Sequence, residues 1–250
     1  MTPLDDAIVR PVRTKRSPNL GHRAVLAASE EDVRGLKNAL ALTDSYSLYL
    51  SRLHYKADAP NIPVVVGPFI GAPYAVMLFE ILRAWGIQEI IFLGWCGTID
   101  ETVPIGNIIL PTGALIDEGT SVQYGQCGND AVQTDDTLRC LLKKGLSQCG
   151  IDYISGVVWT TDAIFRETRT QVQKFQQLGA LAVEMELSAL LSAGRFYNLP
   201  IAAILIVSDE LFTFQWRQGF RSEKFRQSRI AICKAVAKLF SSSNKGKNDC

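Results

Sequence analysis

Short apolar runs of strand length alternate with segments of helical periodicity along most of this 250-residue chain. The clearest strand is 199–207, an almost wholly apolar run, and the clearest helix is 72–85, in which Met77, Ile81 and Ala84 share one face. Alternation of this kind predicts an α/β fold with a mixed or largely parallel sheet covered by helices on both faces. The remaining predicted strands are 22–28, 47–53, 62–66, 89–93, 107–116 and 153–159, with a short one at Leu181; the remaining predicted helices are 30–42, 134–148, 167–178, 185–197 and 216–240.

The two ends of the chain lack this alternation. Residues 1–20 combine three prolines with a cluster of basic side chains, and residues 241–250 are rich in serine, asparagine and lysine. Such composition is typical of chain ends that do not pack. We therefore expect a flexible N-terminal arm at 1–20, a single domain at 21–240 and a disordered tail at 241–250, since one domain of this size can bury a large core.

Composition and charge narrow the class of partner. With 47% hydrophobic and 20% charged residues and a net charge of +1, the chain presents no electrostatic case for nucleic acid or a membrane as its main partner. Its longest apolar runs are too short to span a bilayer. Its first residues include Asp5, Asp6, Arg10 and Arg13 rather than an apolar signal core. We therefore expect a small-molecule partner and a cytoplasmic location.

Histidine and cysteine usage argues against a metal site. His22 and His54 are the only histidines, and neither has a neighbour at the spacing of a metal ligand. The six cysteines have no Cys-x-x-Cys spacing, which is typical of reduced thiols in the cytoplasm. We expect neither a metal nor any other cofactor.

Two acidic residues, Glu186 and Asp209, stand in otherwise apolar segments. Residues 183–192 are predicted to pass from a strand end into a buried helix, and Asp209 follows the apolar strand at its C-terminal end. Because ligands in open α/β sheets bind beyond the carboxyl ends of the strands, both acids can face one pocket. Sugar hydroxyls need hydrogen-bond acceptors and a leaving base needs a proton, so this pair suits nucleoside chemistry.

Each acid also has a purely structural interpretation. Glu184 and Glu186 alone would be ordinary surface residues of a helix that has Met185 in the core. Ser208 and Asp209 would simply cap a following helix. Further motifs are needed to choose between these interpretations.

Four segments in a consistent order resemble one known family. They are Gly-Pro-Phe-Ile-Gly-Ala-Pro at 67–73, Ile-Ile-Phe-Leu-Gly-Trp-Cys-Gly-Thr at 90–98, Gly-Val-Val-Trp-Thr-Thr-Asp-Ala-Ile-Phe at 156–165, and Val-Glu-Met-Glu at 183–186 with the Ser-Asp strand that follows it. Over residues 22–240 the chain is similar to the nucleoside phosphorylase superfamily, which includes hexameric purine nucleoside phosphorylases, uridine phosphorylases and methylthioadenosine nucleosidases. The resemblance implies a three-layer phosphorylase-like domain with a central mixed sheet flanked by helices.

The resemblance implies roles for three residues at the sugar. Glu186 would accept hydrogen bonds from the ribose hydroxyls, Met185 would pack under the sugar, and Ile70 would approach it. An ionised acceptor beside an apolar floor fixes a pentose well, because hydrogen bonds to charged groups are the strong ones.

At the base, the resemblance makes Asp209 the general acid, with Ser208 beside it and Phe165 stacked on the ring. Breaking the glycosidic bond places negative charge on the base, and a carboxyl that donates a proton relieves that charge. Uridine phosphorylases lack this aspartate, so Asp209 favours a purine. For Phe165, a place in the hydrophobic core is an equally good interpretation.

The resemblance also implies a site for the nucleophile or an anion. It assigns Gly71, Trp95 and Gly97 to this site, because glycine allows close backbone approach. Arg52 would reach the site from a neighbouring subunit, which predicts self-association as a dimer, trimer or hexamer.

This nucleophile site departs from the family pattern. Residues 27–32 are Ala-Ala-Ser-Glu-Glu-Asp where a phosphorolytic member has a Gly-Asp-Pro turn, and Phe92 and Trp95 replace an arginine and a small hydroxyl residue. Phosphate binding normally needs fixed cations and hydrogen-bond donors. We therefore expect phosphate to bind weakly or not at all.

Three functional hypotheses follow. The first is a nucleoside phosphorylase-type pentosyltransferase that cleaves the N-glycosidic bond of a nucleoside, preferably a purine nucleoside, with inorganic phosphate as a co-substrate. The second is a nucleosidase, which uses water because the phosphate site is degraded. The third is a non-catalytic protein that binds a nucleoside or base on the same scaffold. The presence of both Glu186 and Asp209 favours catalysis, whereas Phe92 and Trp95 argue against phosphorolysis.

Overall fold

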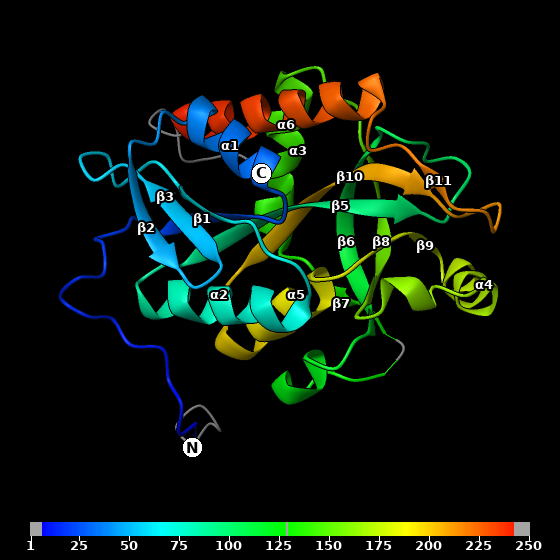
Figure 1. Ribbon diagram of the computed structural model, residues 1–250, viewed down its shortest axis with the longest axis horizontal. Helices are drawn as coiled ribbons and strands as arrows, with labels where there is room; N and C mark the ends of the chain where they lie inside the picture. Colours follow the sequence, from blue (N-terminus) through cyan, green and yellow to red (C-terminus); the bar gives the residue numbers. More distant parts are fainter. Residues whose placement is uncertain (1–6, 129, 243–250) are drawn as a thin grey trace.

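The computed structural model describes residues 7–128 and 130–242. These residues form three layers, in which a twisted mixed sheet lies between two groups of helices (Figure 1). The predicted α/β fold is therefore confirmed. The strands are β1 (Arg23–Ala27), β2 (Asp44–Leu48), β3 (Ser51–Tyr55), β4 (Val64–Gly67), β5 (Glu89–Thr98), β6 (Ile108–Asp117), β7 (Val132–Gln133), β8 (Ile154–Thr161), β9 (Ala180–Glu184), β10 (Ile201–Glu210) and β11 (Arg217–Gln218).

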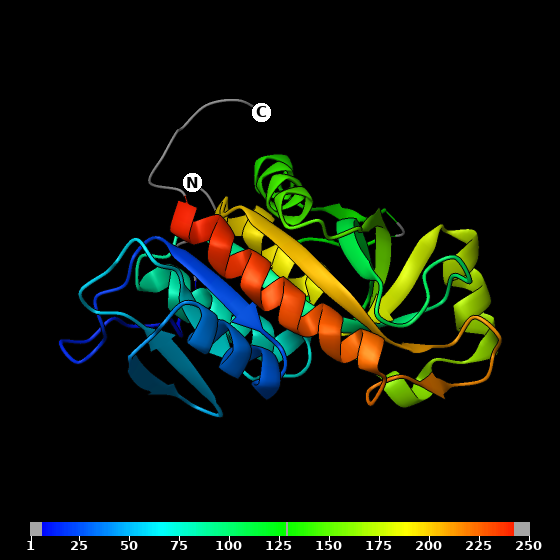
Figure 2. The ribbon, with the colours of Figure 1, turned by 90° about the horizontal axis from the view of Figure 1, so that it is seen from above.

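Helices cover both faces of the sheet. On one face α1 and α3 pack against the long helix α6, which crosses the sheet beside α1, and on the other face α2 packs against α5 (Figures 1 and 2). The short helix α4 lies beside β9. The helices are α1 (Glu30–Ala39), α2 (Ala72–Ala84), α3 (Asp136–Gln148), α4 (Arg169–Gln177), α5 (Leu187–Tyr197) and α6 (Glu223–Ser242), with short 3₁₀ turns at η2 (Ser121–Tyr124) and η3 (Ile164–Arg166).

The strand pairings bring distant segments of the chain to one edge of the sheet. β1 pairs in parallel with β4 and β5, and β5 pairs in parallel with β10, so the carboxyl ends of these strands lie together. Strands β5, β10, β6, β8 and β9 also form a closed circuit of pairings. Within it, Gly97 of β5 lies opposite Asp209 on one side and Val183 on the other. The two acidic segments identified in the sequence therefore meet at this edge.

The helices near this edge have N-cap residues that are favoured at the start of a helix. Ser29 caps α1 by accepting a hydrogen bond from the backbone N–H of Asp32, and Thr168 forms a capping box with Gln171 at α4. Helix α2 begins instead at Gly71, whose φ of 85° is accessible mainly to glycine.

The predicted strand 47–53 is wrong, because this segment is a hairpin. β2 and β3 pair in an antiparallel manner across it, and Tyr49 takes a positive φ of 51° in the connection. The turn consists of Tyr49 and Leu50, so none of the glycine or asparagine residues that usually mark a tight hairpin was present to reveal it.

The predicted helix 216–240 begins later than expected. Arg217 and Gln218 pair with β10 as β11, and α6 starts only at Glu223, where Ser222 Oγ accepts a hydrogen bond from the backbone N–H of Phe225. The serine cap and not the upstream aromatic residues sets the start of the helix.

Two boundaries next to the acidic segments also differ from prediction. The strand predicted at 89–93 continues to Thr98, so the glycines at 94 and 97 lie within β5. The helix predicted at 185–197 begins at Leu187, which leaves Glu186 at its N-cap. The apolar pattern identified both elements correctly. The glycines within β5 obscured the end of the strand, and the acidic residues before α5 obscured the start of the helix.

The predicted chain ends and the state of the cysteines differ in part from expectation. Residues 7–20 contain no helix or strand, α6 runs to Ser242, and residues 1–6 and 243–250 of the predicted arm and tail lie outside the described residues. Cys140 is disulfide-bonded, so the expectation of reduced thiols is wrong for that residue, whereas Cys96, Cys127, Cys149 and Cys233 are free. Within the described chain, no helix is long and apolar enough to cross a membrane, and no cluster of three or more metal-binding side chains occurs.

Candidate active site

A cavity of about 550 Å³ opens at the edge of the sheet where β1, β5 and β10 end. Eight of the predicted site residues line it: Ile70, Trp95, Gly97, Phe165, Met185, Glu186, Ser208 and Asp209. The other lining residues are Ala28, Ser29, Phe69, Cys96, Ile164, Glu167, Val183, Glu184, Leu211, Trp216 and Phe220. A second hollow of about 490 Å³, beside the C-terminal end of α5, contains none of the predicted site residues.

Asp209 points into the cavity because of a bulge in β10. Val207 pairs with Cys96 and Asp209 pairs with the next residue, Gly97, so Ser208 is an extra residue in the ladder. Since side chains alternate along β5, this shift places Asp209 on the opposite face of the sheet from Val207. Gly97 leaves room for the carboxyl, because a Cβ there would lie 2.9 Å from Asp209 Oδ2.

Both carboxyl oxygens of Asp209 accept hydrogen bonds. The Ser208 hydroxyl donates to Oδ1 at 2.6 Å, and the Trp216 indole N–H donates to Oδ2 at 2.8 Å. Burial raises the pKa of Asp209, and the two donors oppose this rise because they favour the charged form. The protonation state of Asp209 is therefore set by burial on one side and these two neighbours on the other.

Glu186, a second carboxyl of the cavity, is held by the backbone at the N-cap of α2. The N–H of Gly71 donates to Glu186 Oε1 at 2.6 Å. Burial raises the pKa of Glu186, and the bond from Gly71 opposes the rise. Gly71 does not line the cavity itself, and its N–H is directed at Glu186.

Glu184 anchors the start of α5 beneath Glu186. Its carboxyl accepts hydrogen bonds from the backbone N–H groups of Glu186 at 2.8 Å and Leu187 at 2.7 Å, and from the Thr160 hydroxyl. Burial raises the pKa of Glu184, repulsion by Glu186 raises it further, and the three donors oppose both effects. The two glutamates therefore titrate as a coupled pair.

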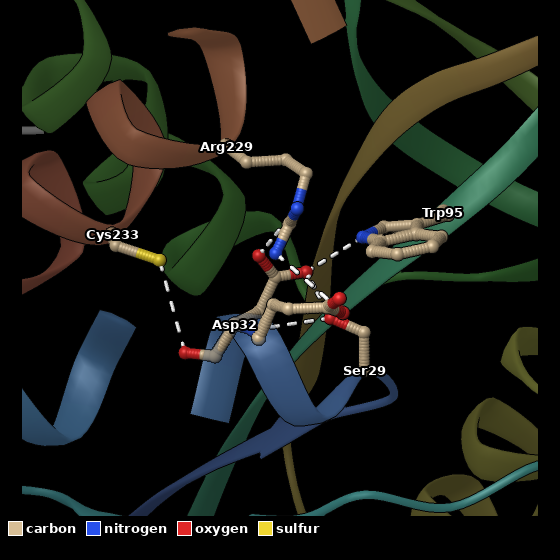
Figure 3. Close-up of polar contacts among 6 residues, drawn as sticks. Ser29, Asp32, Trp95, Arg229 and Cys233 are labelled. Atoms are coloured by element: carbon tan, nitrogen blue, oxygen red, sulfur yellow. Dashed lines mark hydrogen bonds and ion pairs between the residues drawn. The ribbon is translucent and has the colours of Figure 1, made fainter. Parts of the chain in front are cut away.

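An internal ion pair contacts Ser29 and Trp95, which line the cavity at the expected nucleophile or anion site (Figure 3). Asp32 of α1 is 1% exposed and accepts hydrogen bonds from Trp95 Nε1 at 2.6 Å, Ser29 Oγ at 2.7 Å and Arg229 Nε at 2.8 Å. Arg229 belongs to α6, so this cluster joins α1, β5 and α6. The donors that an external anion would need are already bound to a carboxylate of the same chain.

Aromatic packing holds the Trp95 indole in this orientation. The Phe225 ring meets Trp95 edge-on with 5.0 Å between the ring centroids, and the Arg229 guanidinium lies 4.8 Å from the centroid of the Trp95 ring. Phe92, the other residue that departs from the family pattern, is fully buried against Phe69 and does not line the cavity. Trp95 thus narrows the cavity directly, whereas Phe92 belongs to the core.

The remaining predicted residues divide between the cavity and the surface. Met185 lines the cavity, as does Ile70, whose side chain is mostly exposed. Phe165 lines the mouth and is 91% exposed, so it is not a core residue. Arg52 lies outside the cavity of its own chain, on β3, where it donates a hydrogen bond to Ser45 Oγ at 3.4 Å.

Three residues of the site were missed in the sequence. Glu167 lines the cavity and stands two positions after Phe165, the predicted stacking residue, which was the available signal. Trp216 was placed in a helix, and Arg229 had no local signal because its partner Asp32 lies 197 positions away. By contrast, Glu210, the neighbour of Asp209 in β10, is buried outside the cavity lining and accepts a hydrogen bond from Arg217 at 2.8 Å.

The ionisable side chains that line the cavity include carboxyls but no cationic group. Four carboxyl side chains line it, and no lysine, arginine or histidine is among its lining residues. A group of carboxyls with no cation favours ligands that donate hydrogen bonds and disfavours anions. The four carboxyls belong to Glu167, Glu184, Glu186 and Asp209.

Comparison with known proteins identifies the family. Residues 22–242 match the sequence profile of the phosphorylase superfamily. The chain belongs to this superfamily. It is 26% identical over 180 residues to a DeoD-type purine nucleoside phosphorylase of Clostridium novyi (strain NT), covering 71% of this chain and 76% of the relative. It is 31% identical over 153 residues to the DeoD-type enzyme of Bacillus cereus (strain B4264), covering 60% of this chain and 64% of the relative, slightly under two thirds.

Solved structures of the superfamily share the fold. Uridine phosphorylase from Vibrio fischeri ES114 has a TM-score of 0.76 at 19% identity, covering 93% of this chain and 100% of that chain. AMP nucleosidase from Bacteroides thetaiotaomicron VPI-5482 has a TM-score of 0.71 at 18% identity, covering 90% of both chains. The relatives thus include phosphorylases and a nucleosidase, so membership of the superfamily does not choose between the two reactions.

The hydrogen bond from Trp216 to Asp209 allows a direct test of the acid's environment. Replacing Trp216 with phenylalanine removes a donor that favours the charged carboxylate, so we expect the pKa of Asp209 to rise further above its ordinary value. Carbon NMR of the side-chain carboxyl measures this pKa. Phe220→Leu is the matched control, because Phe220 also lines the cavity but donates no hydrogen bond to Asp209. An unchanged or lowered pKa in the Trp216 variant contradicts the assignment.

Proposed function

We propose that this protein cleaves the N-glycosidic bond of a purine nucleoside and uses water rather than phosphate as the nucleophile. The observation that carries this proposal is the position of Asp32, which takes up the hydrogen-bond donors of Trp95, Ser29 and Arg229 at the nucleophile end of the cavity. A phosphate dianion there would lose its solvation without gaining a free cation. A neutral water molecule has no such requirement.

Two carboxyls that line the cavity, Glu186 and Asp209, suit the two halves of a nucleoside. Glu186, beside Met185, offers an acceptor to the sugar hydroxyls, and Asp209 faces the base. In the reaction the C1′–N bond breaks with its electron pair moving to the base, which takes a proton from the enzyme's carboxyls. Water adds its oxygen to C1′ and gives up a proton, so a free pentose and a free base result.

Ser29 is the polar group that remains available at the nucleophile end. Its hydroxyl proton is donated to Asp32, and its oxygen accepts the backbone N–H of Asp32 at 3.1 Å. One lone pair of the oxygen is left to accept a hydrogen bond from a water molecule. We assign the nucleophilic water to this position.

Charge also bears on the class of substrate. A 5′-phosphate on the sugar would enter a cavity that is lined by four carboxyls and by no cationic side chain. Repulsion of this kind favours a nucleoside over a nucleotide. We therefore propose an uncharged nucleoside, in contrast to the AMP named for the Bacteroides relative.

Phosphorolysis is the second candidate, and the DeoD-type relatives favour it. It would require a cation from outside the chain, and Arg52 is the residue that the family resemblance offers. Arg52 is exposed on β3, so a neighbouring subunit would have to bring it to the cavity.

Product analysis separates the two reactions. We expect inosine or adenosine to yield free pentose at a rate that does not depend on added phosphate, because the anion end is occupied by Asp32. Chromatography of the sugar product with and without millimolar phosphate measures this. Pentose 1-phosphate formed in proportion to phosphate would establish the protein as a phosphorylase, and no cleavage under either condition would favour a non-catalytic binding protein.

The roles proposed for Asp209 and Glu186 predict different kinetic effects when each residue is replaced. Asp209→Asn should lower kcat by about 10²–10⁴-fold with a smaller change in KM, because the carboxyls that protonate the base act mainly in the transition state. Glu186→Gln should raise KM as well as lower kcat, because it removes a charged acceptor from the sugar. Steady-state kinetics on the better purine nucleoside test both, and wild-type rates in both variants would show that the site lies elsewhere.

We also propose that the protein self-associates around the mouth of the cavity. Large apolar side chains are exposed on the hairpin connection and among the lining residues: Leu50 at 86%, Ile70 at 73% and Phe165 at 91%. The hairpin lies close to α2, because the Tyr74 hydroxyl accepts the N–H of Leu50 at 3.0 Å. We propose that these exposed apolar side chains meet a neighbouring subunit.

Sedimentation velocity tests this assembly. We expect the wild type to sediment as a dimer or larger species and Leu50→Glu to shift it toward monomer, because a buried glutamate would be unpaired. Ile230→Glu on α6, which is also an exposed apolar residue, is the control and should leave the assembly intact. A monomeric wild type with full activity would remove both the interface and the role of Arg52.

A further inference from the structure

Glu167 is the carboxyl of the cavity to which no motif assigns a role. It follows η3 directly, and the loop that carries Ile164 and Phe165 places it on the cavity wall. Among the described residues its side chain has no hydrogen-bond or ion-pair partner. A partly buried carboxyl without a partner is costly in its charged form, so its environment favours the protonated state.

Asp209 has the opposite environment within the same cavity. Both of its oxygens accept hydrogen bonds, from Ser208 and Trp216, and such donors favour the charged carboxylate. The two carboxyls also interact, since burial and the charge of Asp209 together raise the pKa of Glu167 to about 7. Of the two carboxyls, Glu167 therefore keeps a proton more readily, and Asp209 carries the charge more readily.

We propose that Glu167 is a second acid of the site and that it holds the proton which the leaving base receives, with Asp209 as its charged partner. The inference rests on the proposed cleavage of a purine nucleoside. As the C1′–N bond breaks, its electron pair moves to the base, and the Glu167–Asp209 pair loses one proton to a base nitrogen. The proton released by the attacking water returns the pair to its starting state, so the step balances.

The same arrangement indicates which nucleoside to use in a test. A pair with one donor and one acceptor matches the edge of adenine, where N7 accepts and the 6-amino group donates. The corresponding edge of a 6-oxopurine presents two acceptors. Adenosine is therefore the natural substrate for the experiment.

A comparison of two leaving groups tests the role of Glu167. Adenine needs a proton to depart, whereas the nitrophenolate of 4-nitrophenyl β-D-ribofuranoside departs without one, and the sugar is the same in both. We expect Glu167→Gln to lower kcat on adenosine by about 10²-fold or more and to change cleavage of the nitrophenyl riboside by no more than about twofold. Retained activity on the nitrophenyl riboside also shows that the variant is folded.

Two variants serve as controls. Glu186→Gln should reduce cleavage of both substrates, because Glu186 is assigned to the sugar that they share. Glu101→Gln should reduce neither, because Glu101 is exposed and does not line the cavity.

The outcomes separate this inference from the proposed function. Equal losses on both substrates, or full adenosine cleavage by Glu167→Gln, would overturn the role of Glu167 while leaving cleavage by the wild type intact. A wild type that cleaves the nitrophenyl riboside but not adenosine would refute purine cleavage and the acid role together. A wild type that cleaves neither compound would refute the proposed enzyme activity and this inference with it.

Discussion

The buried carboxylate of Asp32 is the constraint on which the rest of the site depends. Three side-chain donors converge on it, and they come from the loop before α1, from β5 and from α6. Breaking a buried ion pair by removing one partner is strongly destabilising, by roughly 3–5 kcal/mol. Trp95 and Arg229 are therefore fixed to Asp32, and neither is free to bind an external anion.

The internal pairing of Arg229 with Asp32 determines the charge of the side chains that line the cavity. With the arginine bound internally, the side chains that line the cavity include four carboxyls and no cation. Each of these carboxyls is buried to some degree and shows a raised pKa, chiefly because burial disfavours its charge. A site of this kind suits hydroxyl and amino groups, which a nucleoside offers, and opposes phosphate. The chain keeps the fold of the superfamily, and we propose that Asp32 alters the chemistry at the nucleophile position.

The sequence predicted much of this arrangement, because the apolar pattern and the motif order were strong signals. It placed Glu186 and Asp209 at one edge of the sheet, whereas the obstruction of phosphate by Trp95 stays a prediction. It did not predict the bulge at Ser208, since a bulge depends on the pairing between β10 and β5 and leaves no mark in either strand alone.

Other features escaped prediction for similar physical reasons. The bond between Asp32 and Arg229 joins residues that are far apart in the chain, so no spacing could reveal it. Trp216 was misplaced in a helix because aromatic residues precede the true start of α6, and its bond to Asp209 was lost with that error. The role of Arg52 stays a prediction, because the residue lies outside the cavity of its own chain.

The indole N–H of Trp95 provides the most direct test of the central claim, since it lies at the anion end and is bound to Asp32. Its nitrogen–proton NMR signal, assigned with Trp95→Phe, can be followed while inorganic phosphate is added to the wild-type protein. We predict that the signal stays in place through millimolar phosphate, because Asp32 already holds the donors of this site. A saturable shift of the Trp95 signal in that range would show that phosphate reaches the site and would contradict the account.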